Sequence, residues 1–197
     1  MAPARTSQVV IPVKAFARAK ARLAPALAVA ERAELARDMA VGVVHAAGPQ
    51  RTWVVCDDDE VARWAEGEGA SVCWQPGRGL NGAVHAAVLE RFTAGATRVV
   101  VVHSDLPLIA SLDAVDPMSD ELVLVPDRHG SGTNVVSTPS PSFGFAYGPG
   151  SFDRHVAEGT RLGLVTRIVR DRSLGWDVDE PADLTVFDRL TASPTAR

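Results

Sequence analysis

The sequence predicts an α/β protein, a three-layer sandwich in which helices cover both faces of a mostly parallel central sheet. Four apolar segments rich in Val alternate with three segments of helical periodicity in the first half of the chain. The apolar segments, such as VVIPV and VVVVH, are hydrophobic throughout rather than at every second position. This pattern is typical of strands that are buried on both faces.

The individual elements follow from the same periodicities. Strands are expected at 9–13, 52–56, 71–74, 98–103, 121–126, 134–138 and 164–169. Helices are expected at 30–46, 60–67, 80–94, 151–158 and 181–190, the last with Pro181 in its first turn. We therefore expect one domain over residues 1–190, followed by a frayed tail at 191–197.

The composition argues against several classes of protein. The 197 residues are 46% hydrophobic and 22% charged with a net charge of −4, which disfavours disorder and nucleic-acid binding. No apolar run approaches the roughly 18–20 residues of a membrane span, and 9–13 is too short for a signal peptide. Cys56 and Cys73 lie far apart in apolar runs, as buried side chains do, and zinc-ligand spacing is absent. We expect a cytoplasmic protein with no membrane and no nucleic-acid partner.

Cations gather directly after the first predicted strand. Both lysines of the chain, Lys14 and Lys20, lie there with Arg18 and Arg22 in an alanine-rich segment. Small residues would let the backbone approach a phosphate chain that the cations neutralise. The alternative is a solvated basic turn. A Walker P-loop is excluded, because its motif does not occur.

The next two strands are followed by an acidic run and a glycine-rich segment. Residues 57–59 are all Asp, which suits either a helix N-terminus or the DxD pattern of glycosyltransferases. Residues 77–82 (GRGLNG) match the G-x-G-x-x-G pattern of dinucleotide binding, but they follow the third strand rather than the first. The same segment, with Gly79 and Asn81, could instead close over a nucleotide base, because the Asn81 amide offers both a donor and an acceptor to a purine.

Two acidic motifs suggest a metal site. Asp105 follows the strand at 98–103, where the sheet holds it rigidly, and a carboxylate there suits Mg²⁺ better than it suits a helix cap. Asp177 and Asp179 lie two residues apart on one face of an extended segment, so either could supply a second ligand. His103 is expected to be structural rather than a base.

Glycine-rich turns precede the strand at 134–138 and the helix at 151–158. The first is DRHGSGTN at 127–134, and the second is YGPGS at 147–151. Ser151 is expected to be the N-cap of its helix. Free backbone N–H groups at that end would bind an anion, with an ordinary cap as the alternative.

In this order the motifs resemble those of the guanylyltransferases of coenzyme F-420 biosynthesis (CofC/FbiD), which act on 2-phospho-L-lactate, phosphoenolpyruvate or 3-phosphoglycerate. The likeness extends from Val10 to Leu184 through IPVKAFARAKARLAP, GRGLNGAVHAA, HSDLPL, LVPDRHGSGTN, FAYGPGSF and DVDEPADL. It implies a Rossmann-like nucleotidyltransferase fold of the nucleotide-diphospho-sugar transferase type. The basic loop lacks the GGxGTR of the sugar-phosphate relatives, so phosphate binding would depend more on side chains.

The resemblance also implies roles for individual residues. The positions that match the site for the phosphorylated acid are Thr133, Gly148 and Ser151. The magnesium ligands would be Asp105 and an acid of DVDEP, with Asp179 favoured over Asp177 because it directly precedes the turn and helix. The positions that match the loop around the GTP triphosphate are Lys14, Arg18, Lys20 and Arg22, and the glycine-rich segment adds Gly79 and Asn81 as expected GTP-binding residues. The residues expected to act in catalysis are Asp105, Asp179 and Lys14.

The implied reaction transfers GMP from GTP to the phosphate of the acid and releases pyrophosphate. A phosphomonoester has a second pKa of about 6, so this nucleophile is ionised without a strong base. Abundant Ala and Arg indicate a GC-rich bacterial genome, which favours phosphoenolpyruvate as the acid. The alternatives are an NAD-dependent dehydrogenase that uses GRGLNG and a nucleotide-binding module without activity. The oligomeric state is left open, with a homodimer as one alternative.

Overall fold

A computed structural model describes residues 6–117 and 119–192. For residues 187–192 it describes the backbone only. Its strands are β1 (Ser7–Pro12), β2 (Thr52–Cys56), β3 (Ser71–Trp74), β4 (Arg98–Val102), β5 (Leu122–Pro126), β6 (Thr133–Thr138) and β7 (Thr166–Ile168). Its helices are α1 (Val29–Ala47), α2 (Asp59–Gly67), α3 (Gly79–Thr93), α4 (Ser151–Arg161), α5 (Arg172–Gly175) and α6 (Pro181–Ala192).

The seven strands form one sheet in the order β3-β2-β1-β4-β6-β5-β7. Only β6 among them runs antiparallel to its neighbours, so the predicted mostly parallel sheet is confirmed. Every residue of β4, β5 and β6 is buried, whereas the edge strands β3 and β7 are mostly only partly buried.

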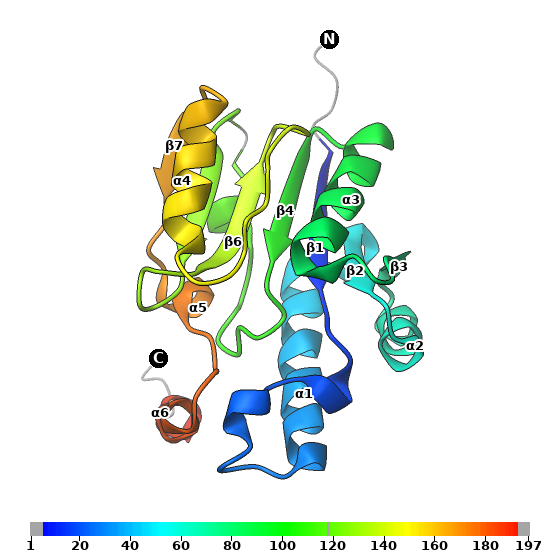
Figure 1. The fold of residues 1–197 in the computed structure, drawn as a ribbon, viewed down its shortest axis with the longest axis vertical. Coiled ribbons are helices and arrows are strands. Elements are labelled where there is room, and N and C mark those ends of the chain that lie inside the picture. Colours follow the sequence, from blue (N-terminus) through cyan, green and yellow to red (C-terminus); the bar gives the residue numbers. More distant parts are fainter. Residues whose placement is uncertain (1–5, 118, 193–197) are drawn as a thin grey trace.

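Helices cover both faces of the sheet, which confirms the three layers (Figure 1). One apolar core joins α1 and α2 to one face, and includes Val44, Val61 and Val100. The other core joins α3 and α4 to the opposite face, and includes Val88, Val101 and Phe152. Because alternate residues of each strand point to opposite faces, neighbouring valines of β4 enter different cores.

The predicted boundaries differ from the structure in a few places. The last strand is shorter than predicted, and the four-residue helix α5 was not expected. Helix α6 continues to Ala192, two residues into the segment predicted as a tail, and 193–197 lie outside the described residues. Asp58 caps α2 by accepting hydrogen bonds from the N–H groups of Glu60 and Val61, so the cap interpretation of the acidic run is confirmed.

The strand order places a crevice at one end of the sheet. Strand β1 pairs with β2 along one edge and with β4 along its other edge, so the order of the strands reverses at β1. In open α/β sheets such a reversal leaves space for a ligand beyond the carboxyl ends of the strands. None of the helices in 6–117 and 119–192 is both long and apolar enough to cross a membrane.

Candidate active site

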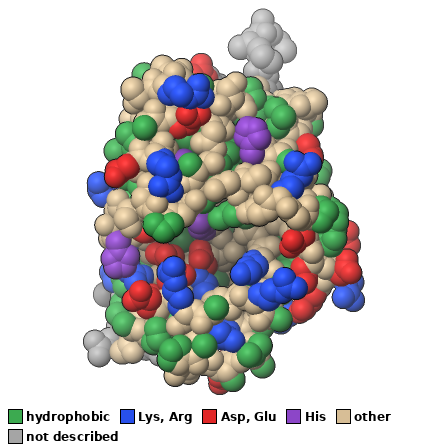
Figure 2. Space-filling model, in the orientation of Figure 1, with side chains coloured by type: hydrophobic (Ala, Val, Ile, Leu, Met, Phe, Trp, Pro, Cys, Tyr) green, Lys and Arg blue, Asp and Glu red, His purple; other side chains and the backbone are tan. Residues whose placement is uncertain are grey.

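A cavity of about 640 Å³ opens beyond the carboxyl ends of β1, β2 and β4. Figure 2 shows this face hollowed across its middle, with Lys and Arg side chains along the lower rim and acidic side chains inside. Seven of the predicted site residues line the cavity: Lys14, Arg18, Lys20, Arg22, Gly79, Asp105 and Asp179. The predicted basic loop and the predicted carboxylates therefore face one space.

Lys20, Asp105 and Asp179 form a charged cluster at the floor of the cavity. The Lys20 Nζ lies 2.7 Å from Asp105 Oδ2 and 3.0 Å from Asp179 Oδ1. Arg22 Nη1 adds a contact of 3.3 Å to the second oxygen of Asp179. One ammonium group thus holds together two carboxylates that are 74 positions apart in the chain.

The backbone at Lys20 is strained to make this contact. Its φ of 51° lies in the left-handed region, and within 6–117 and 119–192 no other non-glycine residue has a positive φ. The side chain is only 7% exposed. Strain of this kind persists where the surrounding structure compensates for it, which is common at functional sites.

The ion pairs dominate the protonation of this cluster. Burial opposes the charge of Lys20, but Asp105 and Asp179 raise its pKa above the ordinary value. Burial likewise disfavours the Asp105 carboxylate, yet the nearby Lys20 lowers the pKa of that carboxyl below its usual range. Lys20 and Asp105 are therefore both charged near neutral pH.

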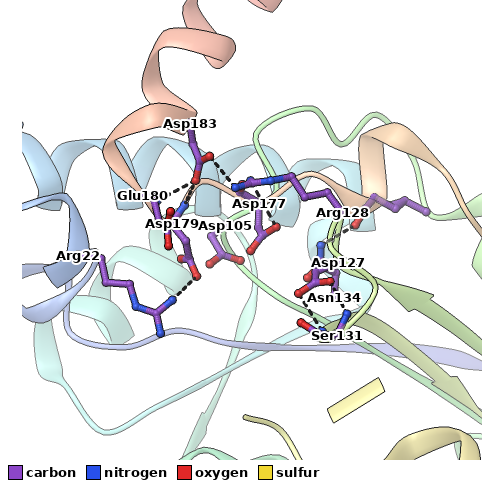
Figure 3. A network of polar contacts seen from close by, with 12 residues as sticks. Arg22, Asp105, Asp127, Arg128, Ser131, Asn134, Asp177, Asp179, Glu180 and Asp183 are labelled. Carbon is purple, nitrogen blue, oxygen red and sulfur yellow. Dashed lines mark hydrogen bonds and ion pairs between the residues drawn. The ribbon is translucent and has the colours of Figure 1, made fainter. Parts of the chain in front are cut away.

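The segment that carries Asp179 is held by Arg128 and Asp183 (Figure 3). Asp183 Oδ2 accepts hydrogen bonds from the N–H groups of Asp179 and Glu180 at 2.9 and 2.7 Å. Its other oxygen accepts from Arg128 Nη2 at 2.6 Å. Burial opposes the charge of Asp183, but these donors lower its pKa below the ordinary value. Neither residue was predicted as a site residue from the sequence, although Asp183 lies in the DVDEPADL motif.

Asp177 lies beside the charged cluster and has a different environment. Figure 3 shows its side chain close to those of Asp105 and Asp179. Burial, and then the repulsion from these two carboxylates, raises its pKa to about 6. Its backbone carbonyl accepts a hydrogen bond of 2.5 Å from Arg128. Lys20 does not contact Asp177 but pairs with Asp179, the residue that the sequence analysis favours.

The carboxylates have the chemistry of a divalent-metal site. Asp105 Oδ1 and Asp177 Oδ1 are buried and have no hydrogen-bond partner in the described part of the chain. Across 6–117 and 119–192, no group of three or more His, Cys, Asp or Glu side chains is arranged to hold an ion. Two hard oxygen ligands are nonetheless enough for Mg²⁺ where substrate phosphates complete its shell. The residues present therefore fit the ion.

Thr133, Ser151 and His155 form a second, hydroxyl cluster. The Ser151 hydroxyl donates to Thr133 Oγ1 at 3.3 Å, and His155 Nδ1 lies 3.0 Å from the same oxygen. Thr133 and Ser151 are each 2% exposed, and His155 is fully buried. Both hydroxyls that the resemblance assigns to the acid thus lie together. His155 was not predicted, although it follows Ser151 by four residues and so shares its helix face.

The N-terminus of α4 differs from the prediction. The N-cap is Gly150 with φ of 70°, and Ser151 is the first residue of the helix with its side chain turned to Thr133. The first two N–H groups are not free, because Ser151 N donates to Gly148 O and Phe152 N donates to Ser131 O. The prediction of Ser151 as the N-cap was therefore wrong, and these two N–H groups are already paired within the chain. Gly148 has a φ of 120°, a conformation that side chains disfavour.

Two glycines shape the turn before Thr133. Asp127 accepts hydrogen bonds from the N–H groups of Ser131 and Gly132 at 2.9 and 2.8 Å. A Cβ on Gly132 would lie 2.5 Å from an Asp127 oxygen, so any larger residue would displace the Asp127 carboxylate that accepts these two hydrogen bonds. Gly130, with φ of 76°, reverses the chain. The GSG sequence thus fixes where β6 begins and where Thr133 lies.

Asn81 has a different task from the base contact that its sequence suggests. Its amide oxygen accepts from Tyr147 N at 2.7 Å, and its amide nitrogen donates to Tyr147 O at 3.3 Å. Both ends of the amide are therefore occupied by backbone. Asn81 ties α3 to the segment that leads to α4, whereas Gly79, at the start of α3, lines the cavity.

His103 and Tyr147 connect the two clusters. His103 lines the cavity, and its ring centre lies 4.8 Å from that of Tyr147, which in turn lies 5.0 Å from that of His155. His103 Nε2 and the Tyr147 hydroxyl are buried without a hydrogen-bond partner among the described residues. Burial lowers the pKa of His103 and raises that of Tyr147, so both are neutral. A lowered pKa makes His103 a weaker proton acceptor, and its expected structural role stays a prediction.

Solved structures with the same fold define the class. A protein of Desulfovibrio desulfuricans classed as a nucleotide-diphospho-sugar transferase matches with a TM-score of 0.73 and 19% identity, over 96% of this chain and 89% of that one. A cytidylyltransferase of Leptospira borgpetersenii matches with a TM-score of 0.61 and 13% identity, over 97% and 89%. The chain therefore has the fold of the nucleotidyltransferases, as predicted.

The sequence identifies the family within that class. The family model described as "Guanylyl transferase CofC like" matches residues 7–187, and the chain belongs to this family. A phosphoenolpyruvate guanylyltransferase of Chloroflexus aggregans is 36% identical, over 91% of this chain and 95% of the relative. One of Conexibacter woesei is 38% identical over 93% and 88%. A 2-phospho-L-lactate guanylyltransferase of Methanothermobacter thermautotrophicus is 31% identical over 89% and 81%.

Proposed function

We propose that this protein is a guanylyltransferase of coenzyme F-420 biosynthesis that transfers GMP from GTP to the phosphate of phosphoenolpyruvate. The observation that carries the proposal is the charged cluster, in which Asp105 and Asp179 share one cation beside a cavity rimmed with Lys and Arg. Relatives named phosphoenolpyruvate guanylyltransferase support the choice of acid over 2-phospho-L-lactate. A soluble, cytoplasmic enzyme is consistent with this role.

The reaction is a displacement at phosphorus. A phosphate oxygen of phosphoenolpyruvate bonds to the α-phosphorus of GTP, the bond from that phosphorus to the bridging α–β oxygen breaks, and pyrophosphate leaves with its electrons. The attacking oxygen is already ionised, since the second pKa of a phosphomonoester is about 6. The reaction therefore requires no strong base from the chain, and burial makes His103 in the cavity lining a weak one. Its task is to position two anions that repel each other.

Asp105 and Asp179 would hold Mg²⁺, with Asp177 as a neighbouring carboxylate. When bound there, the ion supplies positive charge that phosphate oxygens of both substrates can share. Before substrate arrives, Lys20 keeps the two carboxylates close together. A cation of the chain itself thus holds the two proposed metal ligands together in the free protein.

Lys14, Arg18 and Arg22 would neutralise the triphosphate and the departing pyrophosphate. All three are exposed at the rim of the cavity, so a polyanion reaches them without burial of unpaired charge. Arg22 is 72% exposed even while it contacts Asp179. Gly79 at the start of α3 would lie against the nucleotide, whereas Asn81 would act by holding Tyr147.

The hydroxyls of Thr133 and Ser151, with the turn at Gly148, would orient the acid. They are not among the residues that line the cavity, but Asn134, the neighbour of Thr133, accepts a hydrogen bond through its carbonyl from the N–H of the lining residue His103. A small anionic acid held there would place its phosphate towards Asp105.

Incubation of the protein with GTP, Mg²⁺ and one acid at a time tests the proposal. We expect pyrophosphate release and a guanylylated product of matching mass with phosphoenolpyruvate, and much less with 2-phospho-L-lactate or 3-phosphoglycerate. Binding of GTP without pyrophosphate release with any acid would favour the module without activity. Thermal stabilisation by NADH, and not by GTP with Mg²⁺, would favour the dehydrogenase.

A further inference from the structure

His155 is a buried polar side chain next to the site that the proposed reaction does not yet use. It is fully buried on α4, within a ring of aromatic side chains: Phe143, Phe145 and Tyr147. Both of its ring nitrogens have partners. Nε2 lies 3.0 Å from the backbone nitrogen of Ala146, and Nδ1 lies 3.0 Å from Thr133 Oγ1.

These two contacts determine which nitrogen carries the proton. A backbone N–H can only donate, so Nε2 must accept from Ala146 and has no proton of its own. The neutral ring then carries its proton on Nδ1, which donates to Thr133 Oγ1. Burial, with a smaller effect from the nearby Arg154, lowers the pKa of His155 to about 4, so this neutral form persists at neutral pH.

This tautomer controls what the neighbouring hydroxyls can offer. Thr133 and Ser151 have two hydroxyl protons, and the hydrogen bond between them uses one. Because His155 donates to Thr133, it takes no proton from the pair, and the second proton stays available. With the opposite tautomer, Nδ1 would accept that proton, and the pair would present only lone pairs to a ligand. Lone pairs repel an anion, whereas a hydroxyl proton binds one.

We propose that His155 is a positioning residue that keeps one hydroxyl proton of the Thr133–Ser151 pair directed at the anionic acid substrate. The inference deepens the proposed function and rests on its assignment of this pair to the acid. The N–H of Ala146 determines the tautomer of His155, because it donates to Nε2. The proton on Nδ1 of His155 in turn requires Thr133 Oγ1 to accept. The hydroxyl cluster is thereby set as a donor before the substrate binds.

Three substitutions at His155 separate this role from a packing role. In His155→Asn the side-chain amide can place an N–H near the position of Nδ1, so the donor to Thr133 is kept. In His155→Gln the amide reaches the position of Nε2 instead. In His155→Phe the ring remains and both polar atoms are lost. The readouts are the KM values for phosphoenolpyruvate and for GTP. The unfolding temperature of each variant is measured as well, to confirm that the protein is folded in the assay.

We expect His155→Phe to raise the KM for phosphoenolpyruvate about 10- to 100-fold, the range for one lost hydrogen bond to a charged group, with the KM for GTP within about twofold. His155→Asn should recover most of this loss, and His155→Gln should not. In a Thr133→Val background, His155→Phe should have no further effect on the KM for the acid, because the hydroxyl through which it acts is gone.

Other results would overturn the inference. Equal changes in both KM values, or an unchanged effect of His155→Phe in the Thr133→Val background, would show that His155 only supports packing. If His155→Phe does not fold, the comparison of Asn with Gln still decides, since equal KM values for the acid would contradict the donor role. Failure of the proposed function is distinguishable, because the unsubstituted protein would then form no guanylylated product with any acid.

Discussion

The charged cluster and the hydroxyl cluster lie at the same edge of one sheet but are built in opposite ways. In the charged cluster, Lys20 on an irregular loop neutralises Asp105 and Asp179. In the hydroxyl cluster, neutral groups on β6 and α4 align one another, and His155 has no net charge. The first cluster is held by ion pairs, and in the proposed reaction its cation would exchange partners when phosphates arrive, whereas the second is held by hydrogen bonds between neutral groups.

Their exposures show the same difference. Asp179 is 40% exposed and Asp105 24%, so water and ions reach the charged cluster. Thr133, Ser151 and His155 are at most 2% exposed. Charges that must meet an incoming ion stay near solvent, because full burial of unpaired charge is costly. Hydroxyls can be buried when they satisfy one another, and burial fixes their direction.

The largest expected effect is on the charged cluster. Asp105→Ala should abolish turnover, with a loss of at least about 100- to 1000-fold in pyrophosphate release, because a preorganised electrostatic contact is removed. The fold should stay intact, since Asp105 lies beyond the end of β4. Asp59→Asn, on the exposed first turn of α2, is a matched control that should stay within about twofold. An Asp105→Ala variant within a few-fold of the unsubstituted protein would refute the metal assignment.

The stability contributed by the hydroxyl cluster should decrease at low pH. The pKa of His155 is about 4 in the folded protein against 6.5 when unfolded, so the unfolded chain binds the extra proton first. Its contribution to stability is complete above pH 6.5 and is lost as the pH falls to 4, by about 3 kcal/mol. Urea unfolding of the protein and of His155→Asn at pH 7 and pH 4 measures this. The variant should lose less stability over that interval, and an equal loss would contradict the neutral buried imidazole.

Lys20→Met tests whether Lys20 and Mg²⁺ compete for the same two carboxylates. Removal of the ammonium leaves two facing carboxylates, which should cost about 1–3 kcal/mol, less than for a fully buried pair because Asp179 is half exposed. Mg²⁺ should stabilise the variant more than the unsubstituted protein in thermal unfolding, since it no longer competes with Lys20. Arg22→Met, which removes a side chain that is 72% exposed, should change stability by less than about 0.5 kcal/mol. Equal stabilisation of the Lys20 variant and the unsubstituted protein by Mg²⁺ would place the ion elsewhere.

Apart from the Arg22 control, the smallest expected change in stability is for Tyr147, whose ring lies between the charged cluster and the hydroxyl cluster. Tyr147→Phe removes a buried hydroxyl that has no hydrogen-bond partner among the described residues, while the ring stays packed between His103 and His155. The free protein should gain about 1 kcal/mol, or about 2–4 °C in unfolding temperature. A loss of stability would mean that the hydroxyl is already satisfied in the free protein.

Local pattern was enough to predict much of the molecule. Continuous apolar runs predicted a sheet covered on both faces, and helical periodicity located α1 to α3 within one residue and α4 within three. The position of Asp105 after a buried strand, and the gathering of both lysines in one loop, predicted one wall of the cavity. These features depend on neighbours in the sequence, or on the rule that parallel strands end at one edge.

Only the tertiary structure decided which groups meet. Arg128 contacts Asp183 across 55 positions, and Asn81 contacts Tyr147 across 66, so no local pattern reveals either pair. The tautomer of His155 depends on Ala146 and Thr133, which lie on different segments. Side-chain identity thus determined what each residue can donate or accept. Which partner it actually has was decided by the fold, because hydrogen bonds form over about 3 Å regardless of distance along the chain.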